Sequence, residues 1–132
     1  MQDERHITPE IVSELKEMQT FLESQPVTDD PGELIERLTT LNAYMARSGF
    51  LMAEANADRD AAIAAVFAEH SKAILQMPAT VSQKFIGALC KEENYYATWV
   101  ERINRMCVHQ SDNLRTQVSF AKENMTLTRR GY

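Results

Sequence analysis

Hydrophobic residues recur at alternating intervals of three and four along most of the chain, the spacing of one buried face of an α-helix. The first such stretch starts where Thr8 can cap a helix and Pro9 can occupy its first position. It closes before Pro26, because the residue preceding a proline disfavours helical geometry. A short first helix is therefore expected over residues 9–24, with the apolar stripe Ile11, Leu15, Met18 and Leu22.

A second helix is predicted to begin at Asp30-Pro31, with Asp30 as the cap and Glu33 as the acid of a capping box. No strong helix breaker follows until Pro78, so this helix is expected over residues 31–77. A break at 56–58 is the main alternative. The apolar seam has heptad-like spacing and comprises Leu34, Leu38, Leu41, Met45, Ser48, Met52 and Ala55.

The third predicted helix follows a tight turn at Met77-Pro78-Ala79, with Thr80 and Gln83 spaced as a capping box. It lacks proline and is expected over residues 80–125, leaving 126–132 as a loose tail. Its seam residues are Tyr96, Val100, Ile103, Cys107, Gln110, Leu114, Gln117 and Ala121.

These elements predict an all-α fold, a long antiparallel helical hairpin that the short first helix completes into a coiled-coil-like three-helix bundle. With the turn at 78–79, the numbers of facing residues add up to about 157. Tyr95, Tyr96 and Trp99 then lie opposite the alanine-rich region 58–62. A seam this long and narrow leaves apolar surface uncovered, so we expect a homo-oligomer.

Composition supports a single helical domain, since only 4 Gly and 4 Pro occur in 132 residues. No apolar run is long enough to cross a membrane, and the first residues lack the pattern of a signal peptide, so we expect a cytoplasmic protein. Cys90 and Cys107 lie about 25 Å apart on one predicted helix. They are expected to be small buried hydrophobes, with an intermolecular bridge as the alternative.

The net charge is −5, and the charged residues are unevenly distributed along the chain. Residues 1–70 hold 14 acidic and 5 basic side chains, whereas residues 71–132 hold 5 acidic and 9 basic ones. An acidic half packing against a basic half explains this asymmetry. A basic surface for nucleic acid is the alternative.

The residue types of known catalytic and metal sites do not occur at the required spacings. His6, His70 and His109 form no helical metal-binding pair. Four isolated glycines cannot build a phosphate-binding loop, and Cys107 and His109 point to opposite sides of one helix. We therefore expect no catalytic residue, no metal site and no cofactor, and a protein that is not an enzyme.

Two groups of polar residues on the third predicted helix are candidates for interaction. A polar strip opposite the seam is either a solvated outer face or a recognition surface, and comprises Arg102, Arg105, His109, Asp112 and Arg115. A polar seam either fixes helix register or lines a cavity or interface filled by another molecule, and comprises Gln110, Asn113 and Gln117.

This helix also resembles the C-terminal helix of small helical proteins encoded by bacteriophages and prophages. The resemblance covers about 24 of the 132 residues and rests on Glu101-Arg102-Ile103-Asn104-Arg105, His109-Gln110, Asp112, Leu114-Arg115-Thr116, Ser119 and Lys122. It implies a setting inside a bacterial host cell and no particular activity.

The leading hypothesis is a non-enzymatic, phage-type accessory protein that acts through protein–protein interaction. Inhibition of a host defence system and assistance to phage replication or assembly both fit. The alternatives are a nucleic-acid-associated factor that uses the basic third helix, and a binder of a nucleotide-like small molecule at a subunit interface.

Overall fold

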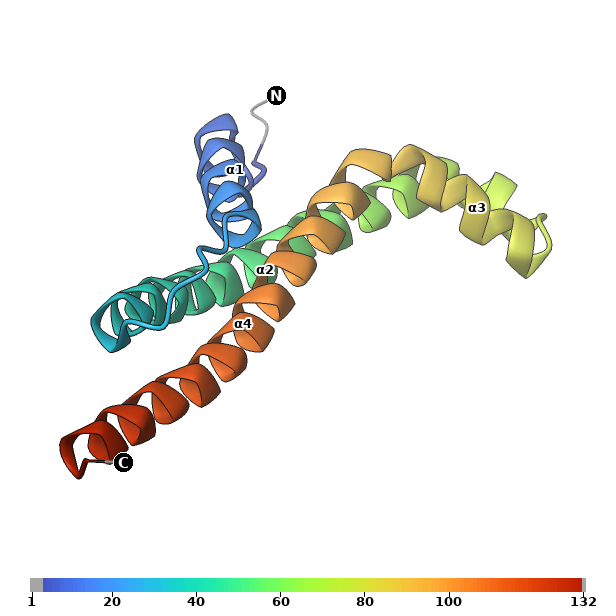
Figure 1. The fold of residues 1–132 in the computed structure, drawn as a ribbon. Coiled ribbons are helices and arrows are strands. Elements are labelled where there is room, and N and C mark those ends of the chain that lie inside the picture. The colour runs from blue at the N-terminus through green and yellow to red at the C-terminus, as the bar shows by residue number, and fades with distance from the viewer. Residues whose placement is uncertain (1–3, 132) are drawn as a thin grey trace.

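The computed structural model describes residues 4–131 and is built from helices alone within that range (Figure 1). In chain order these are α1 (Pro9–Glu23), α2 (Pro31–Leu75), α3 (Ala79–Leu89) and α4 (Lys91–Arg129). The predicted all-α class is confirmed. None of these helices has the length and apolar character required to cross a membrane.

The first two helices begin where their capping residues predict. The Thr8 hydroxyl accepts a hydrogen bond from the Ile11 amide at 3.3 Å, and the Asp30 carboxylate accepts one from the Glu33 amide at 3.1 Å. A proline occupies the first turn of both helices. The capping box predicted at Thr80 is wrong, because α3 starts one residue earlier, with Pro78 at its N-cap and no side-chain cap.

The long helices α2 and α4 pack antiparallel and bury most of the core. Leu41, Leu51, Val100, Ile103 and Cys107 are all at most 1% exposed. Each buried leucine or isoleucine contributes roughly 1.5–3 kcal/mol relative to an exposed one. This apolar interface therefore holds the hairpin together. Figure 1 shows α1 against the middle of the hairpin and α3 at its far tip.

The predicted third helix is divided at Cys90, so the chain has four helices instead of three. Cys90 has φ −110° and ψ 27°, and its fully buried side chain packs with Val66 and Ile74 of α2. Helix α2 is continuous through 56–58, the alternative break point. Its non-helical residue is His70 (φ −119°, ψ 23°), whose ring lies edge-on to Phe85 with centroids 5.3 Å apart.

The hairpin also differs from the predicted register. Asn104 was expected opposite residue 53, but its side-chain amide donates to the Met45 carbonyl and the Ser48 hydroxyl, both at 3.0 Å. Trp99, which was expected opposite residue 58 of α2, donates its indole N–H to Gln19 of α1 at 3.1 Å. The predicted register assumed one unbroken helix on each side of the turn, whereas the structure has non-helical residues at His70 and Cys90.

The prediction of a loose tail over residues 126–132 is wrong for residues 126–129, because α4 continues to Arg129. The hydroxyls of Thr126 and Thr128 donate to carbonyl oxygens one turn earlier, at 3.1 and 2.9 Å. Tyr132 lies outside the described residues.

Candidate functional site: a polar cavity beside the first helix

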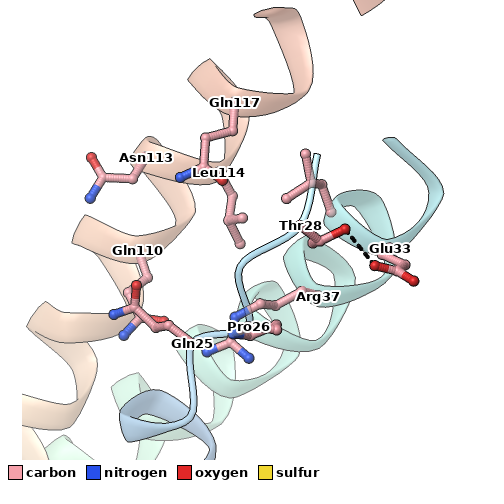
Figure 2. A pocket seen from close by; sticks show the side chains of 10 residues that line it. Gln25, Pro26, Thr28, Glu33, Arg37, Gln110, Asn113, Leu114 and Gln117 are labelled. Carbon is pink, nitrogen blue, oxygen red and sulfur yellow. Dashed lines mark hydrogen bonds between the residues drawn. The ribbon is translucent and has the colours of Figure 1, made fainter. Parts of the chain in front are cut away.

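The three residues of the predicted polar seam line one small cavity of about 70 Å³ (Figure 2). Only Gln110 is buried, with 6% of its surface exposed. Asn113 and Gln117 are exposed at the rim, and Val118 takes the core position predicted for Gln117. We call this space the Arg37 cavity. Its lining comprises Gln25, Pro26, Thr28, Glu33, Leu34, Arg37, Gln110, Asn113, Leu114 and Gln117.

Arg37 and Gln110 close the C-terminal end of α1. Arg37 Nη2 donates to the Phe21 carbonyl oxygen at 2.9 Å and to Gln110 Oε1 at 3.2 Å. Gln110 Nε2 donates to the Leu22 carbonyl oxygen at 2.8 Å. The last carbonyls of a helix lack partners within the helix and carry partial negative charge, so a cation and an amide donor stabilise this end. The buried polar seam residue thus fixes the position of α1.

Arg37 is a half-buried cation with no carboxylate at ion-pair distance among residues 4–131. Burial lowers the pKa of its guanidinium, and the Phe21 ring lies against it, 4.2 Å from centroid to Cζ. Glu33, which lies one turn before Arg37 on α2, accepts a hydrogen bond from the Thr28 hydroxyl, as Figure 2 shows. Within the described residues, Arg37 is therefore stabilised by contacts with neutral groups and not by an ion pair.

Several polar groups around the cavity have no hydrogen-bond partner in the described part of the chain. They are the Nε and Nη1 donors of Arg37 and the side-chain amides of Gln25, Asn113 and Gln117. Such a set of one cation and three amides can donate several hydrogen bonds to a small ligand.

Arg37 was not singled out from the sequence, although a signal was present. It lies three residues after Leu34 and four before Leu41, so helical spacing places it beside the buried seam. A charged residue at such a position requires a partner, and the sequence alone did not identify one.

The predicted polar strip of α4 lies on the solvent side, where all five of its residues are exposed. Arg105 pairs with Glu101 at 2.8 Å, and Arg115 pairs with Asp112 at 3.4 Å, each within one turn of the helix. Arg102 and His109 have no ion pair within residues 4–131. This geometry is that of a solvated face whose positive charge is partly neutralised locally.

A second buried charge lies in α2 and attaches the segment before α1. The Asp58 carboxylate accepts hydrogen bonds from the amides of His6 and Ile7 and from His6 Nδ1, at 2.7–3.0 Å. His6 Nε2 also lies 3.6 Å from Glu54. Burial acts to raise the pKa of Asp58, but the hydrogen bonds outweigh it and the pKa is lowered.

The hydrogen bond to Asp58, with the nearby charge of Glu54, raises the pKa of His6 in return. Across residues 4–131 no three His, Cys, Asp or Glu side chains are grouped to hold a metal ion.

Cys90 and Cys107 are free and fully buried, as the sequence predicted. Burial raises the pKa of both thiols, so they remain protonated at neutral pH and are poor nucleophiles.

Comparison of the chain with protein-family models, curated proteins and solved structures finds no match.

Proposed function

We propose that this protein is a non-enzymatic, self-associating interaction protein that acts by binding other protein chains. One observation carries the proposal. The end of the hairpin formed by residues 61–89, which we call the arm, presents an apolar surface that nothing within the described chain covers. Its helix α3 contains no buried residue at all.

The arm is both apolar and poor in charge. Its large exposed side chains are Phe67 (46% exposed), Leu75 (84%), Val81 (49%) and Leu89 (49%). Only three of its 29 residues are charged, namely Glu69, Lys72 and Lys84, against 25% in the whole chain. Depletion of charge together with exposed apolar side chains is typical of the centre of a protein interface.

A second copy of the chain is the occupant that the charge distribution favours. Two lysines and one glutamate give the arm a charge of +1. Because the net charge of the chain is −5, the rest of the chain carries −6. Two such acidic bodies repel each other at close range. Contact between arms brings the least charged surfaces together and keeps the acidic bodies at opposite ends of the dimer.

Sedimentation velocity and native mass spectrometry over a range of concentrations test this proposal. We expect the full chain to dimerise and the double variant Val81→Lys, Leu89→Lys to remain monomeric. Phe120→Lys is the matched control, because Phe120 is an equally apolar, 62% exposed residue outside the arm. A monomer at every concentration, or equal loss of dimer in the control, would overturn the proposal.

A photo-crosslinker at position 81 identifies the occupant directly. Crosslinks between two copies of the chain are expected. Crosslinks from this position to other proteins alone would contradict the assignment of a second copy.

The proposed setting is the interior of a bacterial host cell, as a bacteriophage or prophage accessory protein. Inhibition of a host defence system and assistance to phage replication or assembly remain the two roles proposed. The resemblance of residues 99–122 to phage-encoded helical proteins supports this setting. The local acidic partners of Arg105 and Arg115 make the strip a weaker surface for nucleic acid than for protein.

A further inference from the structure

We propose that the Arg37 cavity is a binding site for a carboxylate group. The cavity lies beside α1, away from the arm, so this inference does not depend on self-association. Its basis is the guanidinium of Arg37, which lines the space drawn in Figure 2, has no acidic partner in the described range and retains donors without a hydrogen-bond partner there.

The donor set of the cavity matches a carboxylate. A guanidinium has five N–H donors, of which two are accounted for by the bonds from Nη2 to Phe21 and Gln110. The remaining donors are on Nε and Nη1, and the amides of Asn113 and Gln117 stand at the rim on α4. Hydrogen bonds between a guanidinium and a carboxylate are among the strongest in proteins, and partial burial strengthens them.

Size and charge favour a single carboxylate over a larger or more highly charged anion. The space of about 70 Å³ is too small for a nucleotide and is comparable to two or three water molecules. Glu33 also lines the cavity and adds one negative charge to the single positive charge of Arg37. A dianion such as phosphate would meet more repulsion from Glu33 than a monoanion would.

Two sources can present this group: a free small carboxylate, or an acidic side chain of a polypeptide. Sodium acetate represents the first, and a short amidated peptide with one glutamate represents the second. The site is followed by backbone-amide NMR of the full chain, titrated at constant ionic strength against sodium chloride. Saturable shifts confined to residues around the cavity are expected for at least one probe, and the tighter one identifies the source.

Four variants locate the binding. Asn113→Ala and Gln117→Ala remove exposed rim amides that bond to nothing else described, so each is expected to weaken binding severalfold without changing thermal stability. Arg37→Gln is expected to weaken it at least about tenfold. Arg102→Gln removes the same charge from the solvent face of α4 and is expected to leave binding unchanged.

The inference is overturned by an absence of saturable shifts, by equal weakening in Arg102→Gln, or by phosphate binding more tightly than both carboxylate probes. If Arg37→Gln releases α1, the two rim variants decide, because Asn113 and Gln117 take no part in holding that helix. Unchanged affinity in both of them would also count against the site.

Discussion

Two serines on the facing long helices are both fully buried but differ in what their hydroxyls contact. Ser48 donates to the Met45 carbonyl at 3.2 Å and accepts from Asn104 at 3.0 Å. The Ser111 hydroxyl has no hydrogen-bond partner within residues 4–131. A buried hydroxyl that has lost its water without gaining a partner destabilises the folded state.

The pair gives a matched test of this cost. Ser48→Ala is expected to lower the free energy of unfolding by about 1–2 kcal/mol, since it leaves the Asn104 amide short of an acceptor. Ser111→Ala is expected to be neutral or to raise that free energy by up to about 1 kcal/mol. Urea denaturation measures both. Equal destabilisation by the two variants would contradict the structure at Ser111.

Single residues also mark the limit of what the sequence predicted at the candidate site. Helical spacing identified Gln110 as a polar residue in the core, and the structure gives it two partners. Those partners, Arg37 and the Leu22 carbonyl, are 73 and 88 residues away. Side-chain periodicity along one helix carries no information about contacts over such separations, so the capping role of Gln110 required the fold.

At the scale of elements, the segment before α1 is attached to α2 mainly through Asp58. The lowered pKa of Asp58 means that its contribution is present above the ordinary aspartate value near 3.9 and is lost as pH falls further. The raised pKa of His6 means that its contribution is complete below about 6.5 and is lost as pH rises through the folded-state value. Attachment is therefore strongest between these limits.

Amide hydrogen exchange or NMR of His6 and Ile7 measures this window. Protection is expected to be greatest between about pH 4 and 6.5 and to decline on both sides. Asp58→Asn is expected to abolish most of the protection and its pH dependence. Asp60→Asn, which removes an exposed acid two residues away, is the control. The same pH profile in Asp58→Asn and the unaltered chain would exclude Asp58 as the anchor.

Helix starts were more predictable than helix interruptions. Thr8 and Asp30 act locally, since each caps a backbone amide three residues ahead, and both were identified correctly. The interruptions at His70 and Cys90 instead lie where side chains of α2 and α3 pack together, at residues that do not themselves break helices. Local sequence therefore predicted the starts of α1 and α2, but it missed the start of α3 and the interruptions at His70 and Cys90.

For the whole molecule, the core is unevenly divided. The main cluster joins α1, α2 and α4, whereas a separate, smaller cluster has as its buried residues Val66 and Ile74 of the arm and Cys90 directly after it. Few buried apolar contacts mean a low free energy for local opening. The predicted apolar seams end at Ala55 and resume at Tyr96, so the seam analysis did not describe the surface of the arm. The charge depletion of residues 61–89 was the available signal.

Hydrogen exchange followed by mass spectrometry at two protein concentrations tests this division of the molecule. In dilute protein we expect the amides of α3 to exchange well before those of α2 between 41 and 55, because α3 buries no side chain. At high concentration the arm is expected to gain protection, since association stabilises only the folded arm. The double variant Val81→Lys, Leu89→Lys should lack that gain. If α3 is as protected as the main cluster in dilute protein, the arm is not separately stabilised. If α3 exchanges early at both concentrations, the arm is weakly stabilised but does not form a dimer.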